Sequence, residues 1–574
     1  METTNLSKLR RDKMLETIKE IKKNISDETT LDNLSMIENE LTKKKYGLIW
    51  EEHEERVDKE LETQIPTFEE LKDNEIVSNE GGKFNFLLEG DNLHSLYLLE
   101  KTHKCKIDLI YIDPPYNTGN HDFIYNDNYI ISDDGYKHSK WLSFMEKRLR
   151  IAHKLLKDNG MIFISIDDNE QSQLKMLCDE IFGNNNCLGI LPTIMNLKGN
   201  QDQIGFAGTH EYTIVYAKNV STVELGQFDI DEEEIEKEWN LDEVGYYKKG
   251  ANLKSTGVNA PREKRPNLFF PIYVNTDDLD NIKWSVEKIE GYKEVYPITD
   301  EKEMSWRWSK NKFIKDYHDV IVVANGNGDI SFYKKQRPSL GEIPTKKPKS
   351  FFYKPEYSSG NGTNQIIKIF GSKKFSNPKP IELIKDFIKI GMPKKDGIVL
   401  DFFAGSGTTA HALLELNKED NGKRQFILCT NNENNICENV TMQRIKTVIT
   451  GKRADNSEYS DRLLANLKYY KCTYIPKINT DEENLHINLM KNIKNLIQLE
   501  NGIEIDDKKI QVYFDEQSFD EFANNKDLLD ICDKVYISSD ILITSEQEKI
   551  LENNNIKVYV IPEYYFEDEI MEVA

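Results

Sequence analysis

Short apolar runs alternate with amphipathic stretches over two long parts of the chain. Polar or turn-forming residues bound these runs, which predicts strands that are buried on both faces of a sheet. Between the runs, apolar residues recur at the spacing of one helix face. The predicted strands lie at 84–90, 107–112, 161–166, 212–217, from 397 onward and at 425–429, and the predicted helices at 92–101, 141–156, 174–182, 381–390 and 408–416.

This alternation of strands and helices is typical of an α/β fold with a doubly wound, mostly parallel sheet. One helix is marked strongly, because its apolar stripe runs from Leu142 to Leu156 and Gly160 follows as a C-terminal stop. The strand 161–166 then follows directly.

Changes in composition divide the chain into five segments. The first is charged, with apolar residues at helical spacing, which predicts a helical N-terminal region. The α/β alternation stops near the acidic run Asp231–Glu238, and weak periodicity with frequent Gly, Pro and aromatic residues predicts an inserted domain. The alternation then resumes, and a tail with two strand-like runs predicts a small α/β accessory domain. The expected segments are 1–75, 76–224, 225–375, 376–451 and 452–574, of which the second and fourth should build one sheet.

Length and composition narrow the classes of protein. A chain of 574 residues should hold several domains, at roughly one per 150 residues. No apolar stretch is long enough to span a membrane, and the polar start Met1–Asn5 has no signal-peptide pattern. The seven cysteines form no Cys-x2-Cys pair, which favours reduced thiols over disulfides or a zinc site. We therefore expect a cytoplasmic protein without a metal centre.

The net charge of −23 argues at first sight against nucleic acid as a partner. Binding to DNA requires local positive potential, however, and two windows supply it. Residues 247–274 hold six Lys or Arg against one Glu, and residues 331–355 hold seven against one, with aromatic residues in both. Ordinary solvated surfaces are the alternative explanation. Because both windows lie in the predicted inserted domain, we favour contact with phosphates.

The tetrapeptide Asp113-Pro114-Pro115-Tyr116 directly follows the predicted strand 107–112. Reaction sites of open α/β sheets lie beyond the carboxyl ends of their strands. Asp113 and the carbonyl of Pro114 can each accept one hydrogen of an exocyclic amine, and the ring of Tyr116 can stack on a flat base. An ordinary proline-rich turn is the alternative for these four residues alone.

A second strand, starting at Gly397, ends in the turn Ala404-Gly405-Ser406-Gly407 before a predicted helix. The two glycines allow close approach of a ligand to the backbone, and a helix N-terminus favours negative charge. The chain has no Gly-x4-Gly-Lys-Ser/Thr run, so a P-loop ATPase is not supported.

Together these motifs resemble those of the β-class adenine-N6 DNA methyltransferases, and more narrowly the modification subunits of type III restriction–modification systems. In that class the catalytic motif precedes the Gly-rich motif, a circularly permuted order, and here Asp401 follows Asp113 by 288 residues. The resemblance covers roughly residues 45–451. It rests on the runs Leu88–Leu93, Asp113–Asn120, Phe163–Glu170, Arg265–Leu268 and Asp401–Ala412.

The resemblance implies a Rossmann-like methyltransferase with an inserted target-recognition domain, which uses S-adenosylmethionine as cofactor. It also implies double-stranded DNA with a flipped-out adenine as substrate, a homodimer, and a restriction subunit (a helicase–nuclease) as a further partner. A cytosine-N4 methyltransferase and a DNA-binding specificity subunit without chemistry remain alternatives. The DNA sequence that is recognised does not follow from these motifs.

The two motifs, the basic windows and the resemblance together give candidates for individual roles. Three of the residues to which we assign a cofactor role have a local alternative. Asp91 could equally be a helix N-cap, and a plain turn would explain Asn377 and Lys379. Asp167 and Asp168 are adjacent acids, but two acids alone do not form a metal site. The catalytic candidates are Asp113, Pro114, Pro115 and Tyr116; the cofactor candidates are Asp91, Asn377, Lys379, Asp401, Phe402, Phe403, Ala404, Gly405, Gly407 and Glu433; the candidates for the target base or DNA are Tyr212, Arg265, Lys334, Lys335 and Lys347.

Overall fold

The structure of the protein is a computed structural model in which two compact units are distinguished. Unit 1 comprises residues 1–225 with 349–574, and unit 2 comprises residues 226–348. The structure describes residues 6–23, 25, 27–42, 50, 53–125, 128–131, 135–199, 205–278, 282–324, 329–338, 343–477 and 482–561.

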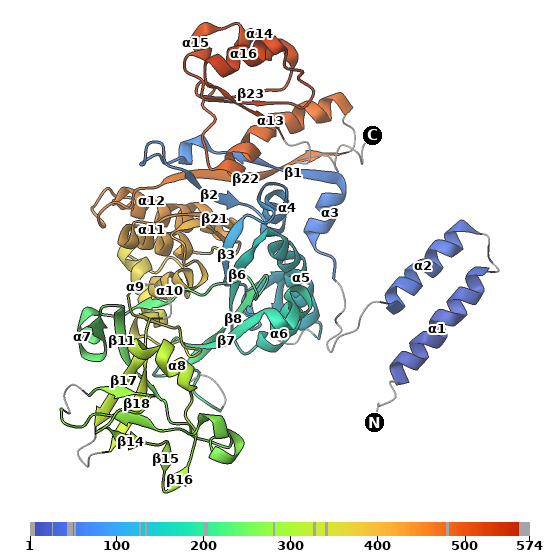
Figure 1. Cartoon of the computed structure of the whole chain (residues 1–574). Coiled ribbons are helices and arrows are strands. Elements are labelled where there is room, and N and C mark those ends of the chain that lie inside the picture. Colours follow the sequence, from blue (N-terminus) through green and yellow to red (C-terminus); the bar gives the residue numbers. More distant parts are fainter. Residues whose placement is uncertain are drawn as a thin grey trace. The chain divides into compact units, whose positions relative to one another are not determined.

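A nine-stranded sheet forms the centre of unit 1 (Figure 1). Its six strands from β22 to β6 run parallel, whereas β1, β8 and β7 each run antiparallel to a neighbour. The predicted α/β fold is thus confirmed. In spatial order the strands are β1 (Gln64–Glu70), β22 (Asn466–Pro476), β2 (Phe84–Glu89), β21 (Lys423–Thr430), β20 (Asp396–Asp401), β3 (Ile107–Ile112), β6 (Leu156–Ile166), β8 (His210–Ala217) and β7 (Cys187–Ile194).

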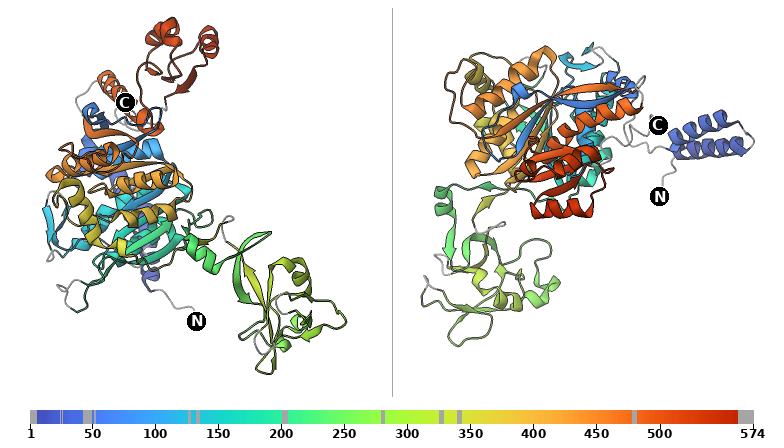
Figure 2. Two further views of the ribbon diagram at one scale, coloured as in Figure 1. Left: turned by 90° about the vertical axis from the view of Figure 1, so that its left-hand side faces the viewer. Right: turned by 90° about the horizontal axis from the view of Figure 1, so that it is seen from above.

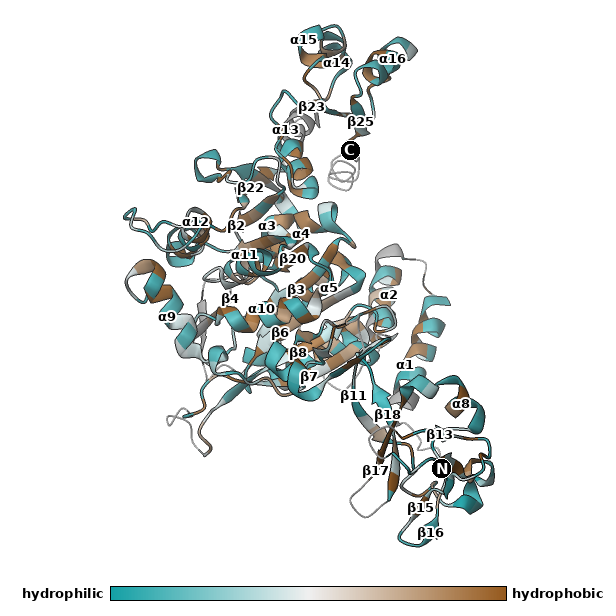
Figure 3. Cartoon of the chain, turned by 60° about the vertical axis from the view of Figure 1, so that its left-hand side comes forward, coloured by the Kyte–Doolittle hydropathy of each residue, from teal (hydrophilic) through white to brown (hydrophobic). Residues whose placement is uncertain are grey.

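The helices of unit 1 pack in two groups, one on each face of this sheet (Figure 2). Figure 3 shows hydrophobic positions concentrated in the central strands and hydrophilic positions on the outer surfaces of the helices. One group holds α4 (Asn92–His103), α5 (Lys137–Leu155), α6 (Gln171–Cys178) and α13 (Glu482–Asn501), and the other α10 (Ile381–Gly391), α11 (Thr408–Asp420) and α12 (Gln443–Thr450).

Strand pairing brings together the two predicted half-sites, which are the tetrapeptide 113–116 and the Gly-rich turn 404–407. β20 and β3 are parallel neighbours, with Val399 opposite Leu109 and Leu400 opposite Ile110. Their carboxyl ends therefore lie at the same edge of the sheet. β3, which comes first in the sequence, carries the tetrapeptide, and β20, which comes later, carries the Gly-rich turn. The two motifs therefore occur in the circularly permuted order.

Several boundaries differ from those predicted. β1 lies within the segment predicted to be helical, and β22 lies within the predicted accessory domain, yet both belong to the main sheet. Helix α5 ends at Leu155 and β6 begins at the next residue, so Gly160 lies inside a strand and is not a helix stop. Residues 349–375, which we assigned to the inserted domain, belong to unit 1.

Unit 2 has its own aromatic core, in which Trp284, Trp306, Phe313 and Phe332 are buried. It is built on an antiparallel sheet of β10 (Asn240–Asp242), β11 (Gly245–Asn252), β18 (Ile330–Gln336) and β17 (Val320–Ala324). Smaller elements are β9 (Phe228–Asp229), α7 (Glu232–Glu238), β12 (Ile272–Val274), β13 (Trp284–Ser285), β14 (Lys293–Val295), β15 (Ile298–Thr299), β16 (Lys302–Glu303), α8 (Lys310–Lys315) and β19 (Thr345–Lys346).

The N-terminal helices and the C-terminal strands form two further parts of the structure. Helices α1 (Leu6–Lys23) and α2 (Glu28–Thr42) pair with each other, and Lys22 Nζ lies 2.8 Å from Glu38 Oε2. Near the other end, β23, β24 and β25 form a small parallel sheet. The remaining elements are α3 (Arg56–Thr63), β4 (Asn120–Tyr125), β5 (Asn128–Ile131), α9 (Ser359–Phe370), β23 (Ile510–Tyr513), α14 (Glu516–Ala523), α15 (Lys526–Leu529), β24 (Lys534–Ile537), α16 (Ser545–Asn553) and β25 (Lys557–Val560).

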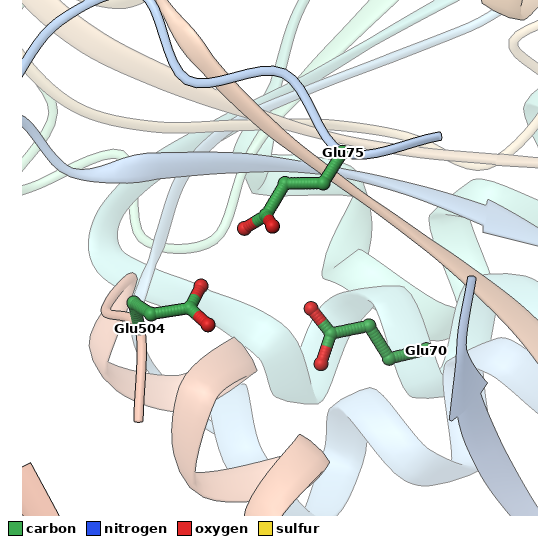
Figure 4. Close-up of side chains that lie close together, drawn as sticks. All are labelled: Glu70, Glu75 and Glu504. Atoms are coloured by element: carbon green, nitrogen blue, oxygen red, sulfur yellow. The ribbon is translucent and has the colours of Figure 1, made fainter. Parts of the chain in front are cut away.

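Three carboxylates, of Glu70, Glu75 and Glu504, converge within the reach of one metal ion (Figure 4). The ammonium of Lys468 on β22, which is fully buried, lies 2.9 Å from Glu75 and also contacts Glu70 and Glu504. This ammonium supplies the counter-charge, so the cluster is an ion-pair link between β1, β22 and the segment after α13. Among the described residues, none of the helices is long and apolar enough to cross a membrane.

Candidate active site

The tetrapeptide leaves the end of β3 in a fixed conformation. The indole Nε1 of Trp141 donates a hydrogen bond to the carbonyl of Pro115 at 2.8 Å, and Pro114 is buried. The next residue, Asn117, has a left-handed backbone with φ of 58° and is fully buried. Its side-chain Nδ2 donates to Glu170 Oε1 at 2.5 Å, and His138 Nδ1 lies 2.7 Å from the same oxygen. Glu170 therefore supports the catalytic loop from behind.

Four polar side chains meet at this loop. Lys379 Nζ lies 2.8 Å from Asp113 Oδ1 and 2.8 Å from the hydroxyl of Tyr116. The Tyr116 hydroxyl lies 2.9 Å from Asp113 Oδ1 and 3.1 Å from Glu211 Oε2, so it can donate to either carboxylate. Glu211 Oε1 lies 3.5 Å from Lys379 Nζ. Two carboxylates thus share one ammonium and one hydroxyl.

Burial controls the charges in this cluster. The side chains of Lys379 and Glu211 are only 10% and 12% exposed, whereas that of Asp113 is 26% exposed. Burial raises the pKa of Glu211, and the positive charge of Lys379 acts in the opposite direction. Burial alone would lower the pKa of Lys379, but Asp113 and Glu211 outweigh it and the pKa is raised. With both carboxylates ionised the cluster carries one net negative charge.

The Gly-rich turn after β20 is shaped by its own hydrogen bonds. Asp401 is buried and accepts from Phe403 N at 3.0 Å and from Thr409 Oγ1 at 2.5 Å. Burial raises the pKa of Asp401 to about 7. Gly405 and Gly407 have φ of 48° and 76°, in the left-handed region that favours glycine. Asp401 therefore holds the turn in shape.

Two further helices support this turn. Thr441 Oγ1 donates to the carbonyl of Gly405 at 2.6 Å. The buried guanidinium of Arg444 donates to Ser406 Oγ at 3.0 Å and to Thr408 Oγ1 at 2.8 Å. On the other side, Asn92 Nδ2 donates to the carbonyl of Phe402 at 2.8 Å. These supporting residues were not identified from the sequence.

Of the remaining cofactor candidates, Asp91 and Glu433 follow strands of the main sheet, and Asn377 precedes α10. Asp91, after β2, caps α4 by accepting from Leu93 N at 2.8 Å, and it lies 3.3 Å from the buried guanidinium of Arg148. The local N-cap explanation of Asp91 is therefore correct, while 38% of its side chain stays exposed. Glu433 is exposed after β21. Asn377 is exposed in a left-handed conformation, with φ of 51°.

These strand ends fit S-adenosylmethionine as a ligand. β2, β21 and β20 are consecutive in the sheet, so Asp91, Glu433 and the turn 401–407 share one edge. A Cβ atom at Gly407 would lie 3.2 Å from Thr441 Cγ2, so a side chain there would be tightly packed, and its positive φ would be strained. Acceptors at Asp91 and Glu433 suit the hydroxyl and amino groups of such a ligand, and the close backbone approach suits its methionine part.

Tyr212, the candidate for the target base on β8, lies next to a residue of the polar cluster. Tyr212 packs against the core and has a ring contact with His210, while its neighbour Glu211 reaches the tetrapeptide. Successive strand residues point to opposite faces, so the strand register selects Glu211. The role of Tyr212 toward the target base stays a prediction, and the structure adds its neighbour Glu211 to the cluster around Tyr116.

The DNA candidates in unit 2 differ in their surroundings. Lys335 Nζ lies 2.6 Å from Asp242 Oδ2, so its charge is offset within the unit. Arg265, Lys334 and Lys347 are exposed.

The chain is similar in sequence to several known proteins. A sequence profile of the DNA methylase family matches residues 107–442. The EcoPI Mod subunit of a type III restriction-modification enzyme, from Escherichia phage P1, is 44% identical over 71% of this chain and 66% of that protein. The type II methyltransferase M.KpnI of Klebsiella pneumoniae is 40% identical, over 60% of this chain and 79% of that protein. The StyLTI Mod subunit of Salmonella typhimurium is 34% identical, over 67% of this chain and 60% of that protein.

The profile covers more than half of the chain and includes both half-sites. The chain belongs to the DNA methylase family. The resemblance to type III modification subunits is confirmed as sequence similarity, and the matched part spans 66% and 60% of the two Mod subunits.

Proposed function

We propose that the protein transfers a methyl group from S-adenosylmethionine to N6 of adenine in DNA. The observation that carries this proposal is the pairing of β3 with β20, which brings the base-gripping tetrapeptide beside the Gly-rich turn. Membership of the DNA methylase family supports it. The alternatives are methylation of cytosine N4 and DNA binding without chemistry, and the hydrogen-bonded cluster around Asp113 and Tyr116 argues against the second.

The residues of the tetrapeptide would grip and orient the target. Oδ1 of Asp113 is engaged by Lys379 and Tyr116, and within the described part of the chain no hydrogen bond uses Oδ2. Oδ2 and the carbonyl of Pro114 can therefore accept the two amine hydrogens, while Tyr116 stacks on the base. A base must leave the duplex to reach them, at a cost of a few kcal/mol, and stacking returns about 1–3 kcal/mol. When bound, S-adenosylmethionine supplies an electrophilic methyl group, and positioning carries much of the catalysis.

We also propose that the protein is the modification subunit of a type III restriction–modification system. In that role it would act in the cytoplasm as a homodimer on double-stranded DNA, together with a restriction subunit. The similarity to the EcoPI and StyLTI Mod subunits supports this role.

Unit 2 is our candidate for target recognition. It interrupts the α/β alternation, has its own core and carries most of both basic windows. We expect exposed cations such as Arg265, Lys334 and Lys347 to contact phosphates, which fix position without reading sequence. Exchanging residues 226–348 for the corresponding segment of a related enzyme should transfer the recognised site. If the exchanged enzyme still methylates the original site, recognition lies elsewhere, most simply in the tail beyond Gly451.

Long-read modification mapping of DNA from cells that express the protein tests the proposed function. We expect N6-methyladenine within one short sequence and none in cells that express Asp113→Ala. N4-methylcytosine at one sequence would select the cytosine alternative. Unmodified DNA, with sequence-specific binding retained, would select the specificity subunit.

A further inference from the structure

One carboxylate oxygen of Glu211 is buried without a hydrogen-bond donor, as are Asn117 Oδ1 and Glu170 Oε2 behind the same loop. Glu211 Oε1 is inaccessible to solvent and accepts no hydrogen bond, although Oε2 of the same carboxylate lies 3.1 Å from the Tyr116 hydroxyl. An ionised oxygen buried without a donor costs free energy, so such a group usually indicates a function or a second state. The cation closest to this oxygen is Lys379 Nζ, at 3.5 Å.

Lys379 is placed to serve two carboxylates in turn. Its ammonium lies 2.8 Å from Asp113 Oδ1 and 3.5 Å from Glu211 Oε1. A displacement of less than about 1 Å would therefore give Glu211 a full charge-assisted hydrogen bond, for which the usual distance is about 2.7–2.9 Å. The Tyr116 hydroxyl can change partner in the same direction, because both carboxylates are within its reach.

We propose that Glu211 is a positioning residue that takes over the ammonium of Lys379 when Asp113 accepts the proton from the target amine. This inference rests on the proposed adenine methylation and deepens it.

The step balances in atoms and charge. The N6–carbon bond forms, the carbon–sulfur bond breaks with its electron pair left on sulfur, and N6 then loses one proton to Asp113 Oδ2. Neutral Asp113 no longer holds Lys379, so the ammonium moves to Glu211 and stays paired. Without Glu211 the buried ammonium would lose its anion, at the cost that attends any unpaired buried charge. Asp113 returns its proton to solvent when the product leaves.

The same geometry explains why Asp113 can accept a proton beside a lysine. One ammonium paired with one carboxylate would stabilise the charged form and make protonation harder. Sharing Lys379 between two carboxylates leaves one net negative charge for the arriving proton. The titratable groups that face Glu211 are Lys379 before α10, Asp113 and Tyr116 after β3, and Tyr111 within β3.

Glu211→Gln tests the proposal because it keeps the size of the side chain and removes its charge. We expect the single-turnover rate of methyl transfer to fall about 10- to 100-fold, the range for loss of one charge-assisted hydrogen bond. Binding of cofactor and of DNA should change less than about 3-fold. The acid limb of the pH–rate profile should move to lower pH, because Lys379 then pairs with Asp113 alone. Glu211→Asp should recover part of the rate.

A second measurement needs no activity. Burial raises the pKa of Glu211, so the contribution of this carboxyl to stability is present at low pH and is lost as pH rises above about 4.5. Glu211→Gln removes this loss, and its melting temperature relative to wild type should therefore increase with pH. Glu224→Gln, at an exposed glutamate of the same unit, is the matched control and should change neither profile.

The outcomes distinguish failure of the proposed role of Glu211 from failure of the proposed adenine methylation. A lower rate with an unmoved acid limb, and no recovery in Glu211→Asp, would make Glu211 merely structural and overturn the proposal. An unchanged rate would overturn it as well. If the wild-type protein forms no N6-methyladenine, the proposed function fails, while the melting measurement still shows whether Glu211 titrates in the folded protein.

Discussion

The ammonium of Lys379 lies 2.8 Å from Oδ1 of Asp113, although 266 residues separate the two in the sequence. Lys379 belongs to the turn that precedes α10, and Asp113 to the loop that follows β3. The fold therefore completes the catalytic cluster only when the two α/β segments join in one sheet. A residue that we had assigned to the cofactor through its motif contacts the catalytic tetrapeptide.

Asp113→Ala should abolish methyl transfer and leave cofactor binding nearly intact. The carboxylate grips the target amine in our account, whereas the Gly-rich turn holds the cofactor. Mass spectrometry of modified nucleosides and titration with S-adenosylmethionine measure the two effects. Substantial formation of N6-methyladenine by the variant would refute the role of Asp113.

Gly407→Val should block binding of S-adenosylmethionine. The residue has φ of 76°, and a Cβ atom would already approach Thr441 Cγ2 to 3.2 Å. Gly371→Val is a matched control, because Gly371 has φ of 74° but nothing within 4 Å of its Cβ position. Calorimetric titration of both folded variants should show loss of affinity only for Gly407→Val. Equal affinity in the two would remove the cofactor role from residues 401–407.

Gly362→Ala should disturb the active site from a distance. A Cβ atom there would lie 2.0 Å from the carbonyl oxygen of Pro378, so the turn that carries Lys379 must move. We expect a fall in methyl transfer of at least about 10-fold, because small misplacements of catalytic groups cost up to about 100-fold. Gly360→Ala, on the same helix, has only Ser358 Oγ nearby at 3.7 Å and should retain activity. Full activity of Gly362→Ala would show that the position of Lys379 does not matter.

Glu170→Gln should change the pH dependence of stability. Burial raises the pKa of Glu170 to about 8, so the contribution of this carboxyl to wild-type stability is fully present below about pH 4.5 and is lost as pH rises toward about 8. Each pH unit in this interval costs at most about 1.4 kcal/mol. Gln keeps the acceptor for Asn117 and cannot ionise, so the variant should gain stability relative to wild type across this interval.

Denaturant unfolding at several pH values measures this effect, with Glu224→Gln as an exposed control. Among the described residues, the titratable groups near Glu170 are His138, Lys137 and Asp167. Parallel stability curves for wild type and Glu170→Gln would show that the carboxyl does not titrate with folding.

The lysines of unit 2 should fall into two classes. Lys334→Ala and Lys347→Ala should weaken binding about equally on cognate and non-cognate DNA, and each should reduce the salt slope by about 1. Lys335→Ala should instead lower the melting temperature, because Lys335 pairs with Asp242 inside the unit. Binding measured over a salt series tests this division. An effect confined to cognate DNA would mean that these residues read bases.

Local patterns explain which parts of this account followed from the sequence. The buried parallel strands and both motifs at their ends are local features, so β3 and β20 were predicted with their turns. β1 and β22 were missed as members of the sheet, since only pairing between distant segments shows that they belong to it. Glu211 was passed over for Tyr212 because the face of a strand residue depends on the register between strands.

Mass spectrometry of nucleosides tests the central claim most directly. Purified protein is incubated with unmethylated DNA and S-adenosylmethionine that carries a deuterated methyl group, and the DNA is then digested. Our account predicts deuterated N6-methyladenine with the wild-type protein and none with Asp113→Ala. Deuterated N4-methylcytosine alone, or no labelled nucleoside from a protein that binds both DNA and cofactor, would contradict it.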